Sequence, residues 1–228
     1  MNGRKVLLLG ILLLLPVLAF LFLQSFGRNA YKLRTYLPES VTAARVGARP
    51  VSGSPNADTV FHRVDDGVEL TAATGQPFSA ARDLRGHAVV LGLGREPTLA
   101  GHADRALVRG LARVQERYRR WPAVKLLTVV PEPTSALAAL AERSGAISGK
   151  WTFARATATA IKHLRAELRD STAVNPDAPS RLWLLDRDRH LRGVYTPTDP
   201  REIDRLLTEI DVLLKIEQNP VWESAASR

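Results

Sequence analysis

Hydrophobic residues in this chain form one long uninterrupted run near its start, followed by short runs and by helically spaced positions. The long run begins at Val6, ends at Phe26 and contains no charged residue. About 20 apolar residues are enough for a helix to cross a bilayer. The apolar part of a cleaved signal peptide is shorter and ends in small residues, unlike the sequence around Phe26. We therefore predict that residues 1–27 form an uncleaved transmembrane anchor.

The stretch that follows the anchor has a different composition. Residues 28–58 show no apolar period over most of their length, and from residue 38 they are rich in Pro, Gly, Ser and Ala. Such a composition is typical of a flexible linker. We predict a linker here, a folded domain over residues 59–219 and a loose tail over residues 220–228.

Short apolar runs and helical periods alternate through the predicted domain. The runs at residues 88–93 and 124–130 are typical of central strands buried on both faces of a sheet. The turn sequence Asp65-Asp66-Gly67 predicts a hairpin between strands at residues 60–64 and 68–71. Helices are expected near residues 107–118, 134–145, 157–170 and 199–218, and a second hairpin between residues 181–186 and 191–195. Thr157 and Asp199 are the expected caps of the last two helices.

This order of elements predicts an α/β fold. Strands alternate with helices, and a hairpin and a helix close the chain, which is the plan of a thioredoxin-like domain with insertions.

Charge and cysteine content narrow the possible functions. The formal net charge is +9, and there is no cysteine. Without cysteine the chain can form no disulfide, no thiolate nucleophile and no thiolate metal site. Basic residues flank the apolar run with no acid among them, which suits a membrane surface; they are Arg4, Lys5, Arg28, Lys32 and Arg34. No basic stripe lies on a known nucleic-acid-binding module, so we expect no nucleic-acid partner.

The second half of the chain carries motifs that resemble those of one family. The stretch RLWLLDRDRHLRGVYTPTDPREIDRLLTEIDVLL is similar to a strand ending in LVDKDG, then RGYYDGTDP, then a helix of the EVDRLIxDIKVLL type. Residues 149–153, GKWTF, match GKWxF, and residues 111–118, LARVQERY, match the helix after a metal motif. These are features of the SCO/SenC family, thioredoxin-fold proteins that handle copper in cytochrome c oxidase assembly.

The residues that carry copper in that family have no counterpart here. Family members bind copper through a CxxxC motif after the first central strand and a distant histidine, a set of ligands that suits copper. Three alignments place the lost cysteines at Glu96 and Ala100, at Thr98 and His102, or at Ala100 and Asp104. The distant histidine would fall near Ala178, where the chain has none. The resemblance therefore implies a vestigial site without a copper cofactor.

The resemblance also implies a role. We expect a non-enzymatic accessory factor in respiratory oxidase assembly, with an oxidase subunit or a copper-binding paralogue as its partner. It implies a single-pass protein of the cytoplasmic (inner) membrane whose domain faces the outside. The alternative is a residual metal-binding copper chaperone that uses His102 and Asp104, although two ligands are few for a metal site. No catalytic or cofactor-binding residue is assigned.

Overall fold

The structure, a computed structural model, describes residues 14–18, 38–42, 58–61, 63–64, 68–96, 98–132, 137–170 and 180–218. The chain divides into two compact units, residues 1–32 and residues 33–228. The described part of the first unit is helical at residues 14–18, so most of the predicted anchor lies outside the described residues. Within the described part of the chain, no helix is both long and apolar enough to cross a membrane.

The second unit contains a mixed sheet with the strand order β4-β3-β7-β6-β5-β8-β9. Its three middle strands are parallel, and the strands at both edges pair antiparallel to their neighbours. The strands are β3 (Leu70–Ala72), β4 (Pro77–Phe78), β5 (Ala88–Leu93), β6 (Val124–Pro131), β7 (Trp151–Ala156), β8 (Leu182–Leu185) and β9 (Leu191–Tyr195). The predicted central strands and the predicted final hairpin are therefore confirmed.

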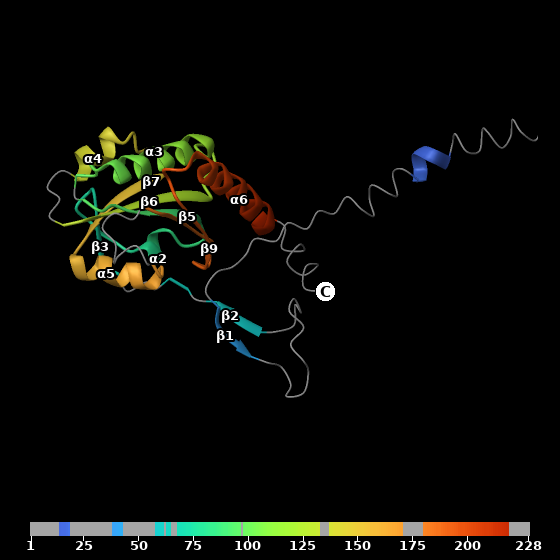
Figure 1. The fold of residues 1–228 in the computed structure, drawn as a ribbon, viewed down its shortest axis with the longest axis horizontal. Helices are drawn as coiled ribbons and strands as arrows, with labels where there is room; N and C mark the ends of the chain where they lie inside the picture. The colour runs from blue at the N-terminus through green and yellow to red at the C-terminus, as the bar shows by residue number, and fades with distance from the viewer. Residues whose placement is uncertain are drawn as a thin grey trace, which may run out of the picture. The chain divides into compact units, whose positions relative to one another are not determined.

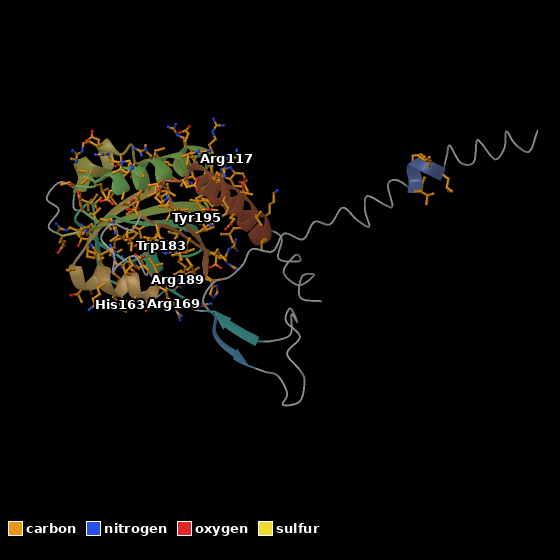
Figure 2. The ribbon with its side chains drawn as sticks, viewed as in Figure 1. Arg117, His163, Arg169, Trp183, Arg189 and Tyr195 are labelled. Carbon is orange, nitrogen blue, oxygen red and sulfur yellow. The ribbon has the colours of Figure 1, made fainter. Side chains whose placement is uncertain are left out.

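Helices cover both faces of this sheet and make a three-layered domain (Figure 1). The helices on one face are α3 (His102–Arg117), α4 (Leu137–Arg143) and α6 (Pro200–Gln218). Those on the other face are α5 (Ala158–Glu167) and the short α2 (Ala80–Asp83). Figure 2 shows the same division, with Arg117 of α3 on one side of the sheet and His163 of α5 on the other.

Strand β5 explains why a short apolar run becomes the centre of the domain. Its alternate residues face opposite sides of the sheet. Ala88 and Val90 belong to the core under α3 and α6, whereas Val89 and Leu91 belong to the core under α5. All six residues of β5 are buried. Burying a valine or leucine side chain contributes roughly 1.5–3 kcal/mol, so this one strand contributes to both cores.

The N-terminal part of the unit differs from the prediction. Residues predicted as linker form β1 (Pro38–Thr42), which pairs antiparallel with β2 (Asp58–Phe61). The first predicted hairpin is wrong, because β2 pairs with β1 whereas β3 pairs with β4 and β7. Its turn, residues 65–67, lies outside the described residues. The sequence of β1, PESVT, has one strongly apolar residue, so no alternating pattern marks it as a strand.

The predicted caps are confirmed. The Thr157 hydroxyl accepts the backbone N–H of Ala160 at 3.2 Å at the start of α5. At the start of α6, a carboxylate oxygen of Asp199 accepts the N–H of Arg201 at 2.9 Å. Both bonds satisfy helix N–H groups that have no partner within the helix.

The GKWTF motif anchors the start of β7. The Trp151 indole N–H donates to the Thr128 hydroxyl at 2.9 Å, and its ring centroid lies 5.1 Å from that of Phe153. Lys150 is buried, and its ammonium group donates to the carbonyl of Trp121 at 2.6 Å. The motif therefore joins β7 to β6 and to the turn before β6.

Strand β9 depends on a glycine. A Cβ on Gly193 would lie 2.0 Å from the hydroxyl oxygen of Tyr195, whose ring covers the glycine. That hydroxyl donates to Glu209 at 2.5 Å, and the Arg205 guanidinium lies 4.7 Å from the ring centroid. Figure 2 labels Tyr195 beside α6, the helix that supplies both partners.

We predict that Gly193→Ala destabilises the domain by about 1–3 kcal/mol, because the new methyl group displaces a buried ring. Urea denaturation of the full-length chain in detergent, followed by tryptophan fluorescence, measures the loss. In a Tyr195→Leu background the same substitution should cost much less. An equal loss in both backgrounds would show that the ring is not the cause.

We also predict a rise in stability at alkaline pH that depends on Lys150. Burial, with a smaller effect of Lys125, lowers the pKa of Lys150 from 10.5 to about 8. Between those two values the unfolded chain binds more protons than the folded chain, so the free energy of unfolding rises with pH. Below pH 8 both states are protonated and the effect is absent. Urea denaturation across this window should show the rise in the wild type and not in Lys150→Met. If the free energy of unfolding changes with pH in the same way in both proteins, the prediction is refuted.

Candidate functional site

The predicted site loop joins β5 to α3 at the carboxyl end of the parallel strands, where ligands bind in open α/β sheets. The loop folds back on itself. Leu99 is buried, and a Cβ on Gly94 would lie 2.5 Å from Leu99 Cδ2. The φ angle of Leu99 is 53°, a left-handed conformation that is uncommon for residues other than glycine. Gly94 is therefore needed to let this side chain pack inward.

Asp104, in the first turn of α3, holds the start of the loop from the inside. Its side chain is 1% exposed. Both carboxylate oxygens accept the backbone N–H of Arg95 at 3.1 Å, and Oδ2 also accepts the N–H of Glu96 at 3.0 Å. The Ser180 hydroxyl donates to Oδ1 at 3.4 Å. Asp104 thus links the loop to α3 and to Ser180, two residues before β8.

The surroundings of Asp104 act on its charge in opposite directions. Burial raises the pKa of Asp104 above its ordinary value of 3.8, and the charge of Glu96 acts in the same direction. The N–H groups of Arg95 and Glu96 and the Ser180 hydroxyl lower it, but burial outweighs them. The lone pairs of the carboxylate are used by donors within the protein. Asp104 therefore has a structural role in the loop.

The other predicted site residues do not converge with Asp104. Glu96, Thr98, Ala100 and His102 are exposed. His102 and Asp104 are two residues apart on α3, and side chains at that spacing do not face each other. In the part of the chain that the structure describes, no three His, Asp or Glu side chains gather into a possible metal site.

These residues do not fit copper. Copper in proteins favours thiolate, thioether and imidazole ligands, and the chain has no cysteine. His102 is exposed, and the Asp104 carboxylate already accepts backbone N–H groups. Ala178, near which the distant histidine is expected, lies outside the described residues.

Ser180 is the contact that the sequence did not reveal. It is separated from Asp104 by 76 positions, yet it is 3% exposed and bonded to that carboxylate. The only signal was its place, next to the segment where the resemblance puts the distant ligand. The contact therefore joins the first turn of α3 to a residue two positions before β8.

Comparison with known proteins identifies the fold. No protein-family model matches the chain, and no curated protein matches its sequence. The chain is similar in structure to BsSco, a member of the Sco family of cytochrome c oxidase assembly proteins, with a TM-score of 0.56 and 12% identity over 68% of this chain and 95% of that one. A SCO1/SenC family lipoprotein from Bacillus anthracis has a TM-score of 0.51 and 13% identity over 64% of this chain and 92% of that one.

A third similar structure is a candidate protein disulfide isomerase from Bacteroides thetaiotaomicron. Its TM-score is 0.52, with 18% identity over 68% of this chain and 90% of that one. The structural neighbours thus include Sco family proteins as well as a thiol–disulfide type. The predicted thioredoxin-like α/β fold is confirmed.

We predict that Asp104→Asn destabilises the domain by about 1–3 kcal/mol, because the amide NH2 that replaces one oxygen cannot accept the loop N–H groups. The raised pKa sets the pH dependence of this loss. Between 3.8 and that raised pKa the folded chain binds more protons than the unfolded chain, so the stability contributed by Asp104 falls as pH rises. The loss should therefore be greatest at acid pH.

Urea denaturation of the full-length chain from acid to neutral pH measures this loss. Asp199→Asn is the matched control, because that exposed carboxylate also accepts a backbone N–H and asparagine caps helices equally well. A loss no greater than that of the control would contradict the structural role of Asp104. A loss that grows as pH rises would instead contradict the raised pKa.

Proposed function

We propose that this protein is a membrane-anchored, SCO/SenC-like accessory factor in respiratory oxidase assembly, which binds other proteins and carries out no copper or thiol chemistry of its own. The observation that carries this proposal is the state of Asp104. One alignment places a lost cysteine at this position, and here a carboxylate is held by the Arg95 and Glu96 N–H groups and by Ser180. A carboxylate that accepts these hydrogen bonds holds the loop in shape and is poorly placed to bind a ligand.

The order of motifs along the fold supports the family assignment. The last three residues of GKWTF begin β7, and the C-terminal stretch forms β8, β9 and α6. The elements follow the order that the resemblance implies. Sco family proteins of the same fold are among the structural neighbours.

The sequence supports the anchoring. The run from Val6 to Phe26 has the length and composition of a membrane-spanning helix. Basic residues lie on both sides of it, so the positive-inside rule does not fix the orientation. Because of the resemblance, we propose a single pass through the cytoplasmic membrane, with the domain outside the cytoplasm.

Affinity purification of the tagged full-length chain from detergent-solubilised membranes of its native host tests the binding role. We expect an oxidase subunit or a cysteine-containing Sco-type protein to co-purify, because a retained fold with an altered site loop keeps a surface for partners. Quantitative mass spectrometry against an untagged strain gives the enrichment. Failure to enrich either class, including after cross-linking, would overturn the assembly role.

Metal analysis of the same purified protein tests the proposed lack of copper chemistry. We expect copper well below one equivalent after growth with added copper. Stoichiometric copper that is lost in a His102→Ala, Asp104→Ala double variant would instead establish a metal-binding role for the site loop. Stoichiometric copper that this variant retains would also overturn the proposal, since it would indicate ligands elsewhere.

A further inference from the structure

A groove lies beside the site loop, between α3 and α4. It has a volume of about 430 Å³ and is lined at one end by Thr98 and Ala100 of the loop. Buried Leu99 and Leu140 contribute apolar surface to it. Three arginines surround it, namely Arg105 and Arg109 of α3 and Arg143 at the end of α4. The volume is within the range of ordinary ligand sites.

The charge of this groove is not balanced. None of the described residues that line it is acidic. Arg105 donates to the carbonyl of Ala100 at 2.5 Å. Arg109 and Arg143 are exposed and have neither an ion pair nor a side-chain hydrogen bond with any other described residue. Arg109 and Arg143 therefore add positive charge here with no partner among the described residues.

The row of arginines along α3 makes this imbalance clear. Arg105, Arg109, Arg113 and Arg117 recur every four residues. Such a row is inclined to the helix axis, so its members gradually turn from one side of the helix to another. Arg113 and Arg117 reach α6, where they pair with Asp204 at 2.5 Å and with Asp211 at 3.2 Å. The first two reach the groove, where α4 supplies another arginine in place of an acid.

A second cleft, on the α5 face, is less distinctive. It has a volume of about 740 Å³ and is lined by Arg95, Lys162, Arg165 and Arg169. Asp170 also lines it and lies 3.6 Å from Arg165. Figure 2 labels Arg169, which lies two residues after the end of α5. Because the Asp170 carboxylate partly neutralises this cleft, an anionic ligand is less strongly favoured there.

The chemistry of the groove favours an acidic protein segment. Arginine binds carboxylates through two parallel hydrogen bonds, and it is enriched at protein interfaces. Leu99 and Leu140 would receive an aliphatic side chain between two acidic ones. A surface that inserts into a membrane needs exposed apolar side chains, and the large exposed apolar side chain described in this unit is Trp121, beyond the other end of α3. The described residues that line the groove include no aromatic side chain for stacking on bases.

We propose that the groove between α3 and α4 binds a segment of a partner protein in which acidic residues flank an aliphatic one. Arg109 and Arg143 pair with the carboxylates, and the apolar surface of Leu99 and Leu140 receives the aliphatic side chain. This binding is independent of copper chemistry and of the identity of any oxidase.

Fluorescence anisotropy with the full-length chain in non-ionic detergent tests the proposal. The probe is a labelled peptide of alternating glutamate and leucine, compared with the same peptide carrying lysine for glutamate. We expect the acidic peptide alone to bind, and an Arg109→Glu, Arg143→Glu double variant to bind it at least about tenfold more weakly, because two attractions become repulsions. The matched control is Arg120→Glu, Arg201→Glu, which makes the same change in net charge at exposed arginines outside the groove.

Circular dichroism verifies that both variants fold, as expected for substitutions of exposed side chains. Equal weakening in the control would attribute binding to net charge and overturn the proposal. So would displacement of the peptide by millimolar phosphate, which would identify a small-anion site. Binding to vesicles of anionic lipid that the groove variant loses and the control keeps would assign the groove to a membrane surface instead.

Discussion

The site loop depends on one buried carboxylate. Asp104 accepts the N–H groups of the two residues with which the chain leaves the sheet, and it does so from the first turn of the helix that the chain then enters. A buried backbone N–H without a partner costs about as much as a lost hydrogen bond. Without Asp104, these N–H groups would lose the partner that holds the start of the loop against α3. Because Ser180 also bonds to Asp104, the same carboxylate fixes the start of the final hairpin.

The elements that the sequence predicted well are those whose hydrophobic pattern is complete in itself. β5 and β6 are continuous apolar runs, and α3 and α6 carry apolar residues on a single face. The cap at Asp199 depends on residues that are close in the chain, so the sequence predicts it as well as it predicts these elements. β1 was not, because its one strongly apolar residue gives no period and its pairing with β2 is a contact between separate segments.

The site was predictable in position but not in structure. Resemblance and strand order placed the loop after β5, where it lies. The three alignments place the lost cysteines at different residues of the loop. The sequence alone does not say which of these side chains turns inward. Burial in the structure distinguishes these residues. Asp104 is 1% exposed, whereas His102, two residues earlier, is at the surface. Its partner Ser180 lies 76 positions later in the chain, so no local pattern could reveal it.

The arginine row of α3 shows how one spacing serves two purposes. A repeat of four residues drifts around the helix, so a single row faces α6 at its end and the groove at its beginning. At its end, acids of α6 neutralise Arg113 and Arg117 and the row stabilises the fold. At its beginning no such acid lies among the described lining residues, although like charges one turn apart destabilise a helix. Pairing of α3 with α6 therefore does not explain why Arg109 lies beside the groove. The difference between the two ends of one helix, rather than the number of basic residues, is what marks the groove as a binding surface.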